Sequence, residues 1–175
     1  KTSGAFDNLL ASKADIIFIA SPSSKQLDTA KSQNVTLDLH KIGSEAFVFF
    51  VNSSNSIDSL TSEQIRGIYS GKYTNWRQLG GSNQFIKAFQ RPEGSGSQSA
   101  LIKFMDDQKL VDPLMDEVES GMGGIVSSVA DYKNSTGAIG FSFRYYLQDL
   151  VANKDIKMLK VDGVEPTIAH IKDLS

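Results

Sequence analysis

The chain has 175 residues, of which 40% are hydrophobic and 22% are charged, the balance of an ordinary globular protein that can bury a core. A formal net charge of -2 gives no general attraction for nucleic acid or for an anionic membrane, so any bound anion must be held by local geometry. The absence of cysteine excludes disulfides, thiolate metal sites and a cysteine nucleophile.

The N-terminal part of the chain alternates helical and strand patterns. Residues 14–21, ADIIFIAS, are a short apolar run typical of a buried strand, and Pro22 and Ser23 are helix-start signals. The expected elements are a helix at 5–13, a strand at 14–21, a helix at 22–34, a strand at 36–40 and a nearly all-apolar strand at 45–52. The last of these should be buried on both faces.

The rest of the chain continues the same alternation. Thr61 should cap a helix that buries Ile65, Ile68 and Tyr69. The further elements are a helix at 60–71, a strand at 85–91, a helix at 98–110, a strand at 137–143, a strand at 156–163 and a helix at 166–174. The pattern predicts an α/β protein.

Residues 91–101, RPEGSGSQSAL, have the composition of an oxyanion receptor. Gly94 and Gly96 allow a tight turn whose N–H groups converge on a small guest, and Arg91 could clamp that guest. The loop leads into a helix, whose N-terminus suits phosphate, sulfate or carboxylate. An ordinary connection between a strand and a helix remains the alternative reading of the glycines and serines.

Catalytic patterns are weak. The two histidines, His40 and His170, accompany no nucleophile elbow, and neither a P-loop nor a dinucleotide fingerprint is complete. The paired acids Asp106-Asp107 and Asp116-Glu117 are expected on solvated polar faces. The residues therefore predict no enzyme activity, no metal site and no cofactor.

Several phrases, taken in order, resemble one family, the phosphate-binding proteins of ABC phosphate importers in the type II periplasmic-binding-protein superfamily. The phrases are ADIIFIASPS, IGSEAFVFFVN, LTSEQIRGIYSGKYTNWRQLGG, RPEGSGSQSALIKFM, GAIGFSFRYY and VDGVEPTIAHI, which together cover nearly the whole chain. The resemblance implies an α/β fold of two lobes joined by crossing strands, with an anion in the cleft between them. It assigns residues 47–140 to lobe II, and residues 1–46 with 141–175 to lobe I, which would be incomplete in this chain.

The resemblance also implies five ligand-binding residues. Arg91 is similar to the arginine that contacts the anion, and Ser95, Gly96 and Ser97 occupy the places of the family's Ser-Gly-Thr anion loop. Thr2 stands in TSGAF, which resembles the Ser-Ser-Gly segment that opens a helix and contacts phosphate through a hydroxyl and the backbone.

Two features depart from the family pattern. The family's first strand and its anion loop, expected upstream of KTSGAF, are absent, as is a C-terminal helix, so we expect a fragment of a longer receptor that self-associates through the incomplete lobe. The carboxylate that follows the "ADI" strand in many phosphate binders is replaced by Ala20-Ser21-Pro22. This change weakens the case for strict selectivity against sulfate.

The resulting prediction is an extracytoplasmic solute-binding protein, lipid-anchored in its full-length form, that captures an inorganic oxyanion for an ABC importer. Its expected partners are phosphate and the permease of the transporter, with no nucleic acid. Two alternatives stay open: a binder of another oxyanion or a small carboxylate, and a sensory or adhesion module that reuses the same fold.

Overall fold

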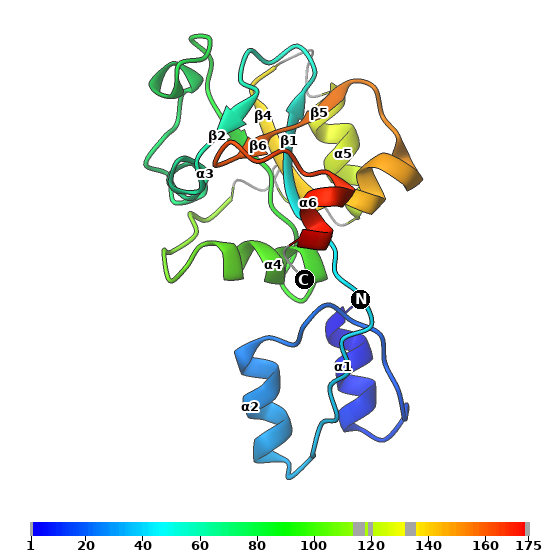
Figure 1. The fold of residues 1–175 in the computed structure, drawn as a ribbon. Coiled ribbons are helices and arrows are strands. Elements are labelled where there is room, and N and C mark those ends of the chain that lie inside the picture. The colour runs from blue at the N-terminus through cyan, green and yellow to red at the C-terminus, as the bar shows by residue number, and fades with distance from the viewer. Residues whose placement is uncertain (1, 114–117, 119–120, 132–135, 174–175) are drawn as a thin grey trace.

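The computed structural model describes residues 2–113, 118, 121–131 and 136–173. Its elements form two groups in space, which we call the N-terminal unit (residues 2–46) and the sheet unit (residues 47–173) (Figure 1). The described residues of the N-terminal unit form α1 (Thr2–Leu10) and α2 (Ser24–Ser32). The sheet unit contains β1 (Phe47–Asn52), β2 (Ser59–Leu60), α3 (Ser62–Tyr69), η1 (Trp76–Leu79), β3 (Lys87–Ala88), α4 (Gly96–Phe104), α5 (Met122–Asp131), β4 (Ala138–Phe143), η4 (Tyr146–Val151), β5 (Ile156–Met158), β6 (Lys160–Val161) and α6 (Ile168–Asp173).

A mixed four-stranded sheet in the order β3-β4-β1-β5 forms the centre of the sheet unit. Strand β1 is antiparallel to β4 on one side, with Phe47 opposite Phe143 and Val51 opposite Ile139, and antiparallel to β5 on the other. Strand β3 runs parallel to β4, while β2 and β6 form a separate parallel pair. Residues 48–51 are each at most 2% exposed, which confirms that the apolar strand predicted at 45–52 is buried on both faces.

Aromatic side chains fill the core between the sheet and helices α3 and α4. The ring of Phe49 lies 4.8 Å from that of Phe104 and 6.0 Å from that of Tyr69, and Tyr69 makes an edge contact with Phe141. The predicted buried face of α3, formed by Ile65, Ile68 and Tyr69, is confirmed. Burial raises the pKa of Tyr69 well above its ordinary value, so its hydroxyl stays neutral.

Helix starts agree with the local sequence signals. Ser23 caps α2 and Thr61 caps α3, each accepting a hydrogen bond from the third residue of its helix. Both helices complete a capping box, since the glutamine three residues on accepts the N–H of the cap. These short-range contacts explain why helix starts can be predicted without knowledge of the fold.

Two predicted strands are absent from the N-terminal unit. The segments 14–21 and 36–40 form no strand, because no neighbouring strand lies beside them among the described residues. Three of their apolar side chains are consequently exposed, with Ile16 at 76%, Phe18 at 78% and Leu39 at 62%.

The expected grouping of residues 141–175 with residues 1–46 is wrong for the strands of that segment. Met158 in β5 pairs with Phe50 in β1, and β6 pairs with β2, so both strands belong to the sheet unit. The physical reason is that β4 pairs with only one edge of β1. After the short helix η4, the chain returns and β5 pairs with the other edge. Two other boundaries differ, since β3 covers only Lys87–Ala88 and α4 ends at Phe104.

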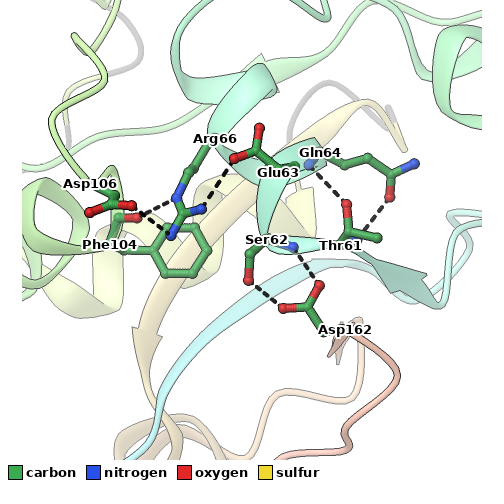
Figure 2. A network of polar contacts seen from close by, with 8 residues as sticks. All are labelled: Thr61, Ser62, Glu63, Gln64, Arg66, Phe104, Asp106 and Asp162. Carbon is green, nitrogen blue, oxygen red and sulfur yellow. Dashed lines mark hydrogen bonds and ion pairs between the residues drawn. The ribbon is translucent and has the colours of Figure 1, made fainter.

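Arg66 in α3 binds the C-terminal end of α4. Its Nε donates to the carbonyl of Phe104 at 2.8 Å, and its guanidinium lies 5.2 Å from the centre of the Phe104 ring (Figure 2). Glu63 and Asp106 neutralise it at 3.3 and 4.0 Å. The clamp matters because the opposite end of α4 lies at the edge of the sheet unit that faces the N-terminal unit (Figure 1).

Asp162 stabilises the N-terminal end of α3. Its carboxylate accepts from the backbone N–H of Ser62 at 2.9 Å and from the Ser62 hydroxyl at 2.5 Å (Figure 2). The side-chain hydrogen bond from Ser62, then the backbone one, lowers the pKa of Asp162 below its ordinary value of 3.8. The negative charge also suits the N-terminus of a helix.

Replacing Asp162 with asparagine should flatten the acid dependence of stability. A carboxyl with a lowered folded pKa stabilises the protein above its unfolded pKa of 3.8, and this stabilisation is lost as pH falls through the folded value. Asparagine tolerates the positive φ of 52° at this position, so the backbone is retained. In urea unfolding, the free energy of unfolding of the variant should lie below that of wild type at about pH 7, and this gap should be smaller at about pH 3. An equal loss at both pH values would contradict the lowered pKa of Asp162.

Candidate functional site

A cleft of about 440 Å³ lies where the two units meet. The N-terminal unit contributes one wall, and the loop before α4 with the end of β4 contributes the other. The lining residues are Thr2, Phe18, Ile19, Ala20, Arg91, Ser95, Gly96, Ser97 and Phe143. The five predicted ligand-binding residues thus lie around one cavity, although Thr2 is far in the sequence from the other four.

Residues 92–95 form the turn that leads into the cleft. The N–H of Ser95 donates to the carbonyl of Pro92 at 3.2 Å, and Gly94 has a φ of 79°. This hydrogen bond and the positive φ at the third residue are the features of a type II turn, which requires glycine there. The turn reverses the chain between Arg91 and the start of α4, so the arginine and the helix N-terminus lie on the same cleft.

Helix α4 begins at this wall of the cleft. Ser95 is its N-cap and accepts the N–H of Gln98 at 3.2 Å. Ser95 and Ser97 are 6% and 3% exposed, so their polar groups are largely removed from bulk water. The first N–H groups of a helix have no partner within the helix and carry the positive end of its dipole, which favours an anion.

The first turn of α1 lies directly against this loop. The N–H of Ser3 donates to the carbonyl of Gly94 at 3.3 Å. A Cβ placed on Gly94 would lie 2.6 Å from the hydroxyl oxygen and 3.0 Å from the Cβ of Ser3, and one on Gly96 would lie 3.0 Å from the hydroxyl oxygen of Thr2. The absence of side chains at both glycines therefore permits the two units to touch at the cleft.

The charge of the cleft is positive and its walls are partly apolar. Arg91 is the only basic residue among the lining residues just named, and none of them is acidic. Ala20, on the wall opposite the loop, carries no group that could accept a proton from a bound anion. Phe18, Ile19 and Phe143 complete the walls, so the cleft offers hydrogen-bond donors and hydroxyls for an anion but no carboxylate to oppose it.

Several contributors to the site were not identified from the sequence. The walls formed by Phe18, Ile19 and Phe143 carried no chemical signal, because apolar residues in strand-like runs are usually core. Gln98 was missed as well. It is 5% exposed and accepts the backbone N–H of Arg91 through Oε1 at 2.9 Å.

The remaining titratable candidates lie away from the cleft walls. Nε2 of the exposed His40 lies 3.0 Å from the carboxylate of Asp38, and Nδ1 of His170 lies 2.6 Å from the carbonyl oxygen of Glu165. The pair Asp116-Glu117 lies outside the described residues. In the described part of the chain, no three acidic, histidine or cysteine residues cluster as a metal site would require.

Arg144 lies in a different pocket from Arg91. Its Nε donates to the carbonyl of Pro166 at 2.7 Å, and it shares a smaller cavity with Gln148 and Thr167.

The described helices include none that is both long enough and apolar enough to cross a membrane.

The chain is similar to known proteins over most of its length. The family described as PBP superfamily domain matches residues 1–174. The phosphate-binding protein PstS of Bacillus subtilis (strain 168) is 26% identical over 132 residues, covering 75% of this chain and 41% of the relative. The phosphate-binding protein PstS of Staphylococcus saprophyticus is 27% identical over 181 residues, covering 98% of this chain and 54% of the relative. The chain thus spans about half the length of these curated relatives.

Solved structures share the fold. A crystal structure with bound phosphate, described as a phosphate ABC transporter substrate-binding protein from Clostridium perfringens, superposes with a TM-score of 0.77 at 25% identity and covers 98% of this chain and 65% of that one. An ABC-type phosphate transport receptor from Vibrio cholerae, at 23% identity, superposes with a TM-score of 0.71 over 99% of this chain and 67% of that one. The predicted fold class is confirmed, and the chain belongs to the family of PBP superfamily domains.

Proposed function

We propose that this protein is a solute-binding protein that captures inorganic phosphate for an ABC importer. The observation that carries the proposal is the convergence of Arg91, Ser95 and Ser97 with the start of α4 on one cleft between two units. A guanidinium, hydroxyls and helix N–H groups are the donors that recognise a tetrahedral oxyanion. A relative at 25% identity holds phosphate in its solved structure, which supports the choice of anion.

The proposal includes a location and a partner. A receptor for an importer acts outside the cytoplasm, lipid-anchored or free, and delivers its anion to the permease of the transporter. Capture and release of an anion need no acid–base machinery, so the protein would not be an enzyme. Thr2 and Gly96 would complete the site from the two units, Thr2 through its hydroxyl and Gly96 through its backbone.

Isothermal titration of the full-length protein with phosphate, sulfate, molybdate and citrate tests the proposal. We expect phosphate to bind at one site, and sulfate to compete measurably, because no carboxylate among the cleft residues opposes a fully ionised anion. Absence of phosphate binding would overturn the function, while binding of citrate or molybdate alone would reassign the ligand. A sensory or adhesion role is separated by asking whether deletion of the protein abolishes phosphate uptake.

A further inference from the structure

We propose that Gln98 is a positioning residue that locks Arg91 to the first turn of α4; this inference rests on the proposed function. Its side-chain Oε1 accepts the backbone N–H of Arg91 at 2.9 Å, while the backbone N–H of Gln98 donates to the hydroxyl oxygen of Ser95 at 3.2 Å. One side chain thereby joins the residue that supplies the positive charge to the helix that supplies the N–H donors.

The side chain of Gln98 does not make the capping-box hydrogen bond that glutamines at the same position make in other capped segments of the molecule. In α2, α3 and η1, the glutamine at the third position accepts the N–H of its own N-cap residue, at distances of 2.8 to 3.0 Å. Those glutamines are Gln26, Gln64 and Gln78. In α4 the same position is Gln98, but its oxygen reaches seven residues back to Arg91, and the N–H of the cap Ser95 turns instead to Pro92.

A second glutamine fixes the orientation of the Gln98 amide. Nε2 of Gln98 donates to Oε1 of Gln90 at 3.0 Å, and Nε2 of Gln90 donates to the carbonyl of Val111 at 2.9 Å. The N–H of Val111 in turn donates to the carbonyl of Tyr69 at the end of α3. Rotating either amide by half a turn would place donors against donors, so this chain of bonds permits one arrangement.

Burial makes the arrangement rigid. Gln98 and Gln90 are 5% and 4% exposed, so water cannot readily replace a lost bond. Of the six buried polar residues among the described ones, four lie between positions 90 and 98. Since Arg66 clamps the opposite end of α4 (Figure 2), the helix is held at both ends while it presents its N-terminus to the cleft.

A matched pair of substitutions separates positioning from structure. Gln98→Met keeps the length of the side chain and removes its hydrogen bonds, and Asn55→Leu does the same to an amide that is also 5% exposed but serves the turn after β1. We expect similar losses of stability in urea unfolding. Phosphate affinity by calorimetry should fall on the order of ten-fold for Gln98→Met and stay within about two-fold for Asn55→Leu.

Two further readouts keep the test decisive. Gln98→Glu, once protonated, again offers a carbonyl to Arg91 and a donor to Gln90, so its affinity relative to wild type should recover as pH falls through the carboxyl pKa. Without any ligand, amide hydrogen exchange at residues 91–97 should accelerate in Gln98→Met and not in Asn55→Leu. Equal affinity and equal exchange in the two variants would overturn the inference, whereas a wild type that binds no phosphate would overturn the proposed function alone.

Discussion

Replacing Arg91 with alanine should weaken phosphate binding by ~10- to ~150-fold, the range expected for loss of a charge-assisted contact of about 1.5 to 3 kcal/mol. The reason is that Arg91 supplies the positive charge among the residues that line the cleft. Calorimetric titration measures the change, and thermal unfolding of the same preparation shows whether the variant stays folded.

Arg144→Ala is the matched control for this experiment. Arg144 is also partly buried, and it lines a separate pocket where its Nε donates to the carbonyl of Pro166. We expect its removal to change phosphate affinity by less than about two-fold, because it does not line the cleft between the units. Equal losses in the two variants would show that Arg91 acts through general charge and not through contact with the anion.

The second large effect should follow from Gly94→Ala, which we expect to reduce phosphate affinity on the order of ten-fold. The new Cβ would approach both the hydroxyl oxygen and the Cβ of Ser3, at 2.6 and 3.0 Å. Rotation of the Ser3 side chain cannot relieve the contact with its Cβ, so the first turn of α1 must move away from the loop. Thr2 would shift with it, which would displace its hydroxyl from its position in the cleft wall.

Gly80→Ala separates this steric effect from backbone strain. Gly80 has a φ of 86°, close to the 79° of Gly94, and a Cβ there meets no atom within 4 Å. Gly80→Ala should lose about 1 to 2 kcal/mol of stability in urea unfolding, the usual cost of a left-handed conformation for a residue with a side chain, and Gly94→Ala should lose at least as much. If Gly80→Ala also lost affinity, or if Gly94→Ala kept it, the contact between the units would have no role in binding.

The parts of the fold that could be predicted from sequence are those specified by neighbours along the chain. Thr61 and Ser23 cap helices because each meets the N–H of a residue three positions away, and the apolar run at 47–51 is buried wherever it pairs. The loop at 91–97 could be recognised for the same reason, since its glycines and serines determine a turn and a helix start locally.

The errors have a common cause in long-range partners. Residues 14–21 have the composition of a strand, but a strand exists only where another strand completes its hydrogen bonds. The pairing of β5 with β1 could not be predicted for the same reason, because the two strands are far apart in the sequence. Gln98 could not be distinguished from Gln26, Gln64 and Gln78, since the four occupy the same position of a helical turn and only the fold brings Arg91 within reach of one of them.

The pairing of β1 with β4 has a consequence for synthesis on the ribosome. Val51 and Ile139 lie side by side although roughly 90 positions separate them, so at about 5 to 20 residues per second the nascent chain carries β1 without this partner for ~4 to ~18 s. During that interval the segment Phe47–Asn52, with its four buried apolar residues, is an unpaired strand of high β-propensity and no charge. We expect a holdase chaperone to bind this segment first, and to be released when β4 emerges.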